Sequence, residues 1–210
     1  MDVYSDLYSK RELVRILRER LEPVEHAEKL LEAIREQYPD ARRAAVLLSL
    51  FEQDGEVYIA FIRRASTLRL HSGEIALPGG SADPSDLSPA RTALREAQEE
   101  IGLEPGRVEV LGVLEPIFTV VSNYVIVPVV AFLPQGLGTL HLQTSEVAEL
   151  LLVSLRRLAD PSIARVEEWT RGGRERKVYF YDYGPYCIWG ATGRIVYEFL
   201  ETLGASEIPA

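Results

Sequence analysis

Cysteine, basic charge and long apolar runs are all scarce in this sequence. Its single cysteine, Cys187, cannot form an intramolecular disulfide and fits a reducing compartment. The 23 Lys and Arg are outnumbered by 32 Asp and Glu, and the formal net charge of -9 argues against a general nucleic-acid binder. No apolar run is long enough to span a bilayer, and the first residues lack the apolar core of a secretory signal. These scarcities predict a cytoplasmic protein with neither a membrane nor a nucleic acid as its partner.

The length of 210 residues is sufficient for one domain with a sizeable core. We expect an N-terminal helical segment over residues 1 to 40, a main domain over residues 41 to 204 and a short tail over residues 205 to 210. The N-terminal helices either pack on the main domain or mate with a second copy. Both a monomer and a homodimer therefore stay open.

Apolar periodicity and turn signals predict the order of the elements. Apolar runs predict six strands, at residues 44–51, 57–62, 108–114, 124–133, 150–155 and 177–183. Helical patterns predict four helices, at residues 10–21 after a Ser9 cap, at residues 27–38, at residues 89–101 and at residues 190–203. Asp54 and Gly55 are expected to form a hairpin turn between the first two strands. Such a mixture of strands and helices predicts an α/β or α+β fold.

The third of these helices can be delimited from its capping residues. Ser88 is a good N-cap, Pro89 suits the first helical position, and Gly102 suits the residue just past the end. Between them, apolar residues recur at three- and four-residue spacing from Ala90 to Ile101, which predicts a stripe that packs on a sheet. The opposite face of the helix should be solvated.

Three glutamates, Glu96, Glu99 and Glu100, lie on that helix at i,i+3 and i,i+4 steps, so their side chains should converge on one patch. Arg95 can pair with Glu99 but leaves most of the negative charge unmatched. Carboxylate oxygens are natural ligands of Mg2+ and Mn2+, which commonly bridge a few carboxylates to substrate phosphates. A solvated acidic face is the alternative on base rates, and the glycine turn before the helix favours the metal-phosphate site.

Positive charge and flexible backbone gather just before this helix. Arg63, Arg64 and Arg69 offer planar guanidinium forks that fit phosphate oxygens. Gly79 and Gly80 permit positive φ and a close backbone approach to an anion. We expect the three arginines and Gly79 to bind the substrate. The alternative is that each arginine only closes a surface ion pair.

The same stretch resembles a known family motif. Residues 95 to 103 match the R-E-U-x-E-E-x-G-U half of the Nudix box, where U is apolar, at every position. The general box has a glycine and a glutamate where this chain has Ser81 and Leu87. Gly80 and Asp86 fit those two roles with one extra residue after them. This longer loop is similar to the one in the coenzyme A pyrophosphatase branch of the Nudix family.

Two further segments resemble the same branch. Arg64, Arg69 and Gly73 precede the turn at the spacing of the branch signature R-[S/A]-x3-R-x3-G-x3-[F/L]-P-G-G. Just upstream, residues 60 to 62 read A-F-I where that branch more often has L-L-T. Residues 187 to 195 are similar to its I-W-G-x-T-x-R-I segment near the C-terminus. The three matches cover about three-quarters of the chain.

The resemblance implies a Nudix-type α/β/α sandwich with a mixed β-sheet. It also implies a divalent ion, Mg2+ or Mn2+, held by Glu96, Glu99, Glu100 and Gly80. The implied reaction is hydrolysis of a pyrophosphate bond in a small nucleotide substrate. Coenzyme A or its thioesters, split to adenosine 3′,5′-bisphosphate and 4′-phosphopantetheine, are the favoured substrates. ADP-ribose, NADH, dinucleoside polyphosphates and nucleoside triphosphates are the alternative substrates, and a non-catalytic nucleotide-binding regulator is the alternative of another class.

The expected catalytic residues are Glu99, Glu146 and Arg95. An activated water attacks one phosphorus in line, and no covalent enzyme intermediate is required. Glu146 is slightly favoured over Glu99 and Glu149 as the general base, and its alternative role is that of an acid in a first helical turn. Trp189 is expected to belong to the core, with support of the substrate as its alternative role.

Overall fold

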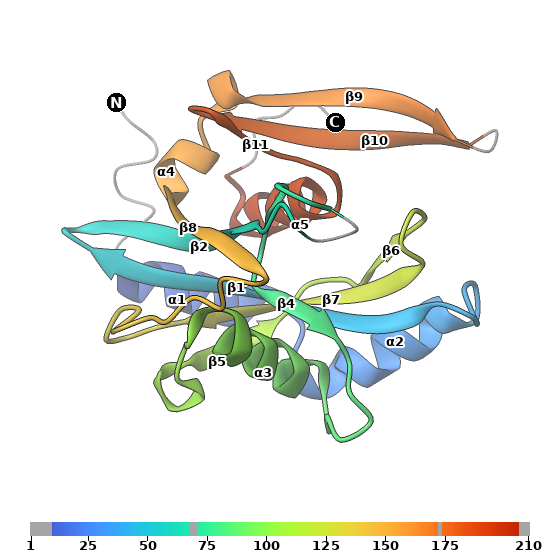
Figure 1. The fold of residues 1–210 in the computed structure, drawn as a ribbon, viewed down its shortest axis with the longest axis horizontal. Helices are drawn as coiled ribbons and strands as arrows, with labels where there is room; N and C mark the ends of the chain where they lie inside the picture. Colours follow the sequence, from blue (N-terminus) through green and yellow to red (C-terminus); the bar gives the residue numbers. More distant parts are fainter. Residues whose placement is uncertain (1–9, 68–70, 172–173, 206–210) are drawn as a thin grey trace.

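The computed structural model describes residues 10 to 67, 71 to 171 and 174 to 205 (Figure 1). Its helices are α1 (Lys10–Arg20), α2 (Ala27–Arg35), α3 (Pro89–Ile101), α4 (Leu155–Leu158) and α5 (Gly190–Leu203), with 3-10 turns η1 (Val24–His26), η2 (Pro105–Arg107) and η3 (Pro161–Ile163). Its strands are β1 (Arg42–Gln53), β2 (Glu56–Arg64), β3 (Ile75–Ala76), β4 (Gly79–Ser81), β5 (Glu109–Val113), β6 (Ile117–Thr119), β7 (Tyr124–Phe132), β8 (Val147–Ser154), β9 (Ala164–Arg171), β10 (Arg174–Tyr183) and β11 (Tyr186–Ile188). The Ser9 cap expected for the first helix lies outside the described residues.

The predicted elements are confirmed in existence and type. The predicted strands correspond to β1, β2, β5, β7, β8 and β10, and the predicted helices to α1, α2, α3 and α5. The second helix is shorter than predicted, because Tyr38 lies beyond α2 and stacks on Phe118 of β6 with ring centroids 3.7 Å apart. The short strands β3, β4, β6 and β11, the longer strand β9 and the helix α4 are additional to the predicted set.

A mixed eight-stranded sheet forms the centre of the molecule. Its order is β3-β2-β1-β7-β5, with β4 paired to β1, β6 to β7 and β8 to β2. The strands β1 and β7 run parallel, and the other pairs of this sheet are antiparallel. The mixed sheet that the sequence resemblance implies is therefore present.

On the side away from β7, the strand β1 pairs with two different strands, one after the other. Near its start it pairs with β4, where Val46 lies opposite Gly79, and at its end it pairs with β2, where Leu50 lies opposite Ile59. Between the two pairings, the Leu47 N–H donates to the carbonyl of Pro78 over 2.7 Å. The strands β2 and β4 therefore diverge beside the glycine turn, and the sheet opens at that point.

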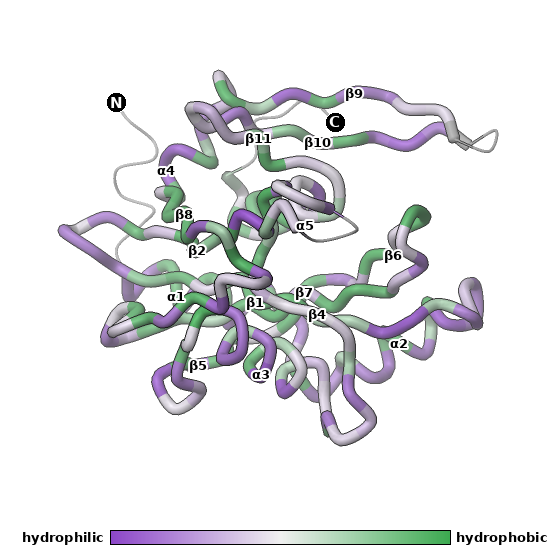
Figure 2. The backbone as a smooth tube through the Cα atoms, in the orientation of Figure 1, coloured by the Kyte–Doolittle hydropathy of each residue, from purple (hydrophilic) through white to green (hydrophobic). Residues whose placement is uncertain are grey.

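Helices cover both faces of this sheet. On one face, Leu13 and Leu17 of α1 belong to the same core as Phe199 of α5. On the other face, Ala97 of α3 belongs to the same core as Leu31 of α2. Figure 2 shows long hydrophobic stretches along β6, β7 and α5. The arrangement confirms the expected α/β/α sandwich.

The first and last described helices are joined. The helix α1 packs against α5, and the Arg20 guanidinium donates to the carbonyl of Thr202 over 2.9 Å. Just after α1, Glu22 forms a β-bridge with Val113 of β5. Of the two arrangements that the sequence left open for the N-terminal helices, packing on the domain is seen for α1. Over the described ranges, the molecule has no helix that is both long and apolar enough to cross a membrane.

A second, three-stranded sheet of order β11-β10-β9 lies over α5 (Figure 1). The ring of Tyr179 in β10 stacks on that of Tyr197 in α5 with centroids 4.0 Å apart. A Cβ atom at Gly193 would lie 2.3 Å from the carbonyl oxygen of Tyr179, so only glycine permits this approach. The helix α5 is thereby held against the underside of the long β9–β10 hairpin.

Candidate active site

The helix α3 begins and ends as its sequence predicts. The Ser88 hydroxyl accepts a hydrogen bond from the Arg91 N–H over 3.3 Å, and Pro89 occupies the first turn. Gly102 ends the helix with a left-handed φ of 71°. These caps fix the rotation and position of the helix, and with them the directions of its three glutamates.

Glu100 is buried rather than solvated. Its residue is 3% exposed, and its Oε2 accepts a hydrogen bond from the Gly79 N–H over 2.9 Å. A guanidinium nitrogen of Arg64 lies 3.9 Å from its Oε1, which is beyond hydrogen-bond distance. Burial raises the pKa of Glu100 to about 7. The expectation that the whole acidic face is solvated is therefore wrong at this residue, because α3 brings it against the turn before β4.

Glu96 is partly buried one helical turn earlier. Its side chain is 16% exposed, and its Oε1 accepts a hydrogen bond from Arg95 over 2.7 Å. A Cβ atom at Gly80 would lie 2.4 Å from Oε2 of Glu96, so the carboxylate rests directly against the glycine backbone. Burial raises the pKa of Glu96 as well. Glu99, by contrast, is 61% exposed and accepts a hydrogen bond from Arg95 over 3.3 Å.

Arg95 joins the helix to the loop that precedes it. Its guanidinium donates to the Ser81 carbonyl and to Asp86, each over 2.9 Å. The Asp86 side chain is only 7% exposed and also accepts from the Thr92 hydroxyl over 3.0 Å. Leu87, the neighbouring residue, is 89% exposed. In this longer loop Asp86 contacts Arg95, and Leu87 faces solvent.

Two acids from the later loop and strand lie in different environments. Glu146 is exposed, its backbone carbonyl accepts from the Ala65 N–H over 2.8 Å, and its negative charge contributes to the raised pKa values of Glu96 and Glu100. Glu149 instead accepts hydrogen bonds from Tyr186 over 2.6 Å and from Arg63 over 2.9 Å. These two hydrogen bonds lower the pKa of Glu149. Glu149 is thus engaged by two partners, whereas no described residue hydrogen-bonds the carboxylate of Glu146.

The predicted arginines are divided between two places. Arg64 lies toward Glu100, and its buried Nε has no hydrogen-bond partner among the described residues. Arg63 is turned toward Glu149 and Tyr186 instead. Arg69 lies outside the described residues. Gly79 adopts φ 153° and gives its N–H to Glu100, so in this structure that N–H is already engaged.

The acidic residues fit a divalent cation without forming a complete cage. Within the described ranges, no group of three His, Cys, Asp or Glu side chains could hold a metal ion by itself. Burial nevertheless raises the pKa of both Glu96 and Glu100, and nearby like charges add to the rise, that of Glu96 at Glu100 among them. A cation would relieve that repulsion. Mg2+ is commonly held by one or two carboxylates with water and phosphate oxygens supplying the other ligands, which suits this pair.

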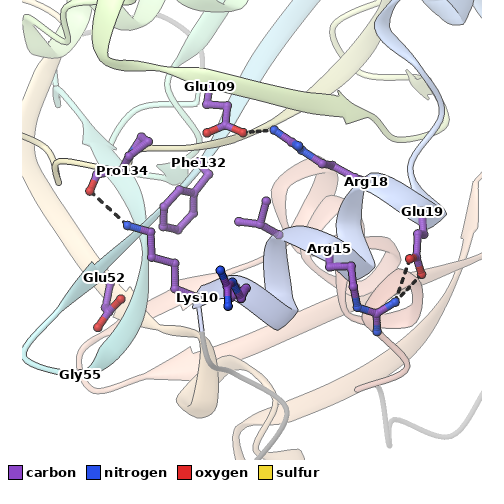
Figure 3. A pocket seen from close by; sticks show the side chains of 11 residues that line it. Lys10, Arg15, Arg18, Glu19, Glu52, Gly55, Glu109, Phe132 and Pro134 are labelled. Carbon is purple, nitrogen blue, oxygen red and sulfur yellow. Dashed lines mark hydrogen bonds and ion pairs between the residues drawn. The ribbon is translucent and has the colours of Figure 1, made fainter.

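A pocket of about 900 Å3 lies elsewhere, beside α1 (Figure 3). Its charged groups already have protein partners: Lys10 donates to the Pro134 carbonyl over 3.3 Å, and Arg18 forms an ion pair with Glu109. The Lys10 ammonium also lies 5.2 Å from the centre of the Phe132 ring. None of the carboxylates that line this pocket is buried as Glu100 is, so the acidic site beside Gly79 is the stronger candidate.

Comparison with known proteins finds the same family that the sequence motifs resemble. The family model described as "NUDIX domain" matches residues 40–172. The chain is 39% identical over 160 residues to "Uncharacterized Nudix hydrolase NudL" of Photorhabdus laumondii subsp. laumondii, a match that covers 76% of this chain and 84% of that protein. It is 38% identical over 163 residues to "Nudix hydrolase 22, chloroplastic" of Arabidopsis thaliana, covering 74% of this chain and 53% of that protein.

A solved structure shares the fold. The crystal structure of a MutT/nudix family protein from Enterococcus faecalis aligns with a TM-score of 0.50 and 15% sequence identity. The alignment covers 94% of this chain and 75% of the other. At this identity the likeness concerns the architecture alone, and it includes most of the elements described above.

Proposed function

This chain belongs to the NUDIX domain family, and on that premise we propose that it hydrolyses the pyrophosphate bond of coenzyme A or its thioesters. The products are adenosine 3′,5′-bisphosphate and 4′-phosphopantetheine. The observation that carries the hydrolytic part is the buried carboxylate of Glu100, pinned by Gly79 and faced by Arg64. The choice of coenzyme A rests on the sequence signature that runs from Arg64 through Gly73 to Gly80.

Glu96 and Glu100 are the residues that we propose to hold Mg2+ or Mn2+, with Glu99 and Gly80 as further contributors. When bound, the ion supplies positive charge that offsets the phosphates and makes a water more acidic. Gly80 has no side chain, and this absence leaves room for the Glu96 carboxylate beside the backbone. Gly79 fixes the Glu100 carboxylate through its N–H. The two glycines therefore orient the two principal acids.

Arg64 is the residue that we propose to receive the pyrophosphate. Its Nε is buried and has no partner in the part of the chain that the structure describes, and an unpaired buried donor costs about 1–3 kcal/mol. A phosphate oxygen supplies the missing acceptor and a matching charge, and guanidinium forks bind phosphate well. The same donors stabilise the negative charge that develops on the phosphoryl oxygens during attack.

Glu146 is the proposed general base. Its exposed carboxylate is near Glu96 and Glu100 and has no hydrogen-bond partner among the described residues, so it is available to accept the proton of the attacking water. The water oxygen attacks one phosphorus in line, the bridging P–O bond breaks, and the two phosphomonoesters separate. The proposed role of Arg95 is to position other residues, because it donates hydrogen bonds to Glu96 and Glu99 and joins Asp86 to the helix.

A substrate panel tests this proposal. The purified protein is incubated with Mg2+ or Mn2+ and, separately, coenzyme A, ADP-ribose, NADH, a dinucleoside polyphosphate and a nucleoside triphosphate, and the phosphate products are identified. We expect coenzyme A to be cleaved to adenosine 3′,5′-bisphosphate with the highest kcat/KM. A higher kcat/KM for any other member would reject coenzyme A as the substrate, and ligand binding without turnover of any member would indicate a non-catalytic regulator.

A further inference from the structure

A second pocket, of about 440 Å3, lies between β2, the segment before β3, and β11. Arg63, Ile75, Tyr186 and Trp189 are among the residues that line it. Ile75 is four residues before Gly79 in the chain, so a short segment connects this pocket to the turn that holds Glu100. The pocket and the acidic site are therefore joined by one short stretch of chain.

The carboxylate of Glu149 fixes the polar side chains of this pocket by hydrogen bonds. Glu149 of β8 accepts from Arg63 Nε over 2.9 Å and from the Tyr186 hydroxyl over 2.6 Å, which joins β2, β8 and β11. Among the described residues, none accepts a hydrogen bond from the two terminal nitrogens of Arg63. Glu74, the carboxylate of the pocket, is paired with His71 at 2.9 Å. Arg63 thus presents a positioned guanidinium edge with free donors.

Another part of the lining is aromatic, and its Trp189 ring is held by two further rings. The Trp189 ring lies parallel to the Phe180 ring, with an interplanar angle of 3° and centroids 6.1 Å apart. The ring centroid of Trp169 lies 6.0 Å from that of Trp189. A ring held by two others loses little freedom when a ligand stacks on it, which favours a flat ligand. Pro185 and Ile75 add apolar surface beside it.

We propose that this pocket binds a nucleoside that carries a phosphate outside the scissile pyrophosphate, with its base against Trp189 and that phosphate on Arg63. The inference rests on the proposed function, because it assigns the pocket to the nucleoside end of that substrate. A flat wall alone would accept any base. The free guanidinium edge adds a requirement for a second anionic group, since guanidinium binds phosphate through paired, charge-assisted hydrogen bonds.

Binding of two product-like ligands tests the pocket without turnover. Adenosine 3′,5′-bisphosphate and AMP differ by the 3′-phosphate only, and their dissociation constants are measured by calorimetry with the full-length protein. We expect the bisphosphate to bind about tenfold more tightly than AMP. The substitution Arg63→Gln should remove that difference while the affinity for AMP stays within about twofold. The matched control Arg157→Gln removes another exposed arginine–carboxylate pair, with Asp160, and should leave both affinities unchanged.

The outcomes separate this inference from the proposed function. Equal affinity of the native protein for the two ligands, or an unchanged preference in Arg63→Gln, would overturn the pocket assignment. Thermal denaturation of Arg63→Gln checks that the variant is folded, and Arg63→Lys, which keeps the charge without the fork, should retain part of the preference. If the substrate panel shows no cleavage of coenzyme A but the bisphosphate preference depends on Arg63, the pocket stands and the proposed reaction fails.

Discussion

The carboxylate of Glu100 accepts a 2.9 Å hydrogen bond from the backbone N–H of Gly79 and so ties the acidic helix to the turn before β4. This contact places a side chain that is almost fully buried beside Arg64 and the edge where the sheet opens. The charge on Glu100 is unfavourable in this position unless a cation or a proton offsets it. The first prediction tests what offsets it.

Replacing Glu100 by Gln should remove metal-dependent turnover and keep the fold. The amide oxygen can still accept from Gly79, and the buried charge disappears, so the free energy of unfolding should not fall. We expect kcat with saturating Mg2+ to drop by at least about a hundredfold. Steady-state kinetics and thermal denaturation are the measurements. Glu104→Gln, which removes an exposed acid just after α3, is the control, and an equally active Glu100→Gln would contradict the ligand role.

Introducing a side chain at Gly80 should disturb the metal site more than the fold. The Cβ of Gly80→Ala would meet Oε2 of Glu96 at 2.4 Å, and the flexible end of the glutamate must move away. We expect activity to need about tenfold more Mg2+ and stability to change by about 1 kcal/mol or less. A metal titration of activity measures the first quantity. Gly106→Ala has no atom within 4 Å of its new Cβ and should show no such shift.

The pairing of Asp86 with Arg95 should make stability depend on pH at the acid end. The Arg95 hydrogen bonds lower the pKa of Asp86 to about 2, below its value in the unfolded chain. A lowered pKa contributes stability that is present above about pH 4 and is lost as the pH falls toward 2.

The magnitude of this contribution is about 2 kcal/mol, because each unit of pKa difference corresponds to about 1.4 kcal/mol. Denaturant unfolding between about pH 2 and pH 5 should show that loss in the native protein and a smaller one in Asp86→Asn. The exposed Asp40 provides the control, and Asp40→Asn should follow the native curve. Parallel curves for the native protein and Asp86→Asn would contradict the assignment.

Substitutions of Glu146 and Glu149 should change different kinetic constants, kcat for Glu146 and KM for Glu149. The substitution Glu146→Gln removes the proposed base and should lower kcat by about a hundredfold or more with little change in KM. The substitution Glu149→Gln weakens the support of Arg63 and Tyr186, so KM should rise about threefold to tenfold while kcat stays near the native value. Steady-state kinetics of both variants measure these effects. A large loss of kcat in Glu149→Gln, with kcat unchanged in Glu146→Gln, would make Glu149 the base.

The sequence predicted those parts of the site that local signals specify. Ser88 and Gly102 delimited α3 because caps depend on a few neighbouring residues. The burial of Glu100 could not be predicted in this way, since it arises from the approach of Gly79 from a different strand. The strand β9 was missed because its residues 165 to 171 are mostly polar and its pairing with β10 is provided by the tertiary structure.

The contact between α1 and α5 has a consequence for how the molecule opens. Arg20 and Thr202 are 182 positions apart, and their hydrogen bond joins the first and last described helices. Each helix covers part of the other's apolar face, so one of them cannot detach without exposing the second to water. We therefore expect the two helices to share one opening equilibrium, so that their backbone amides exchange with solvent as a single cooperative unit.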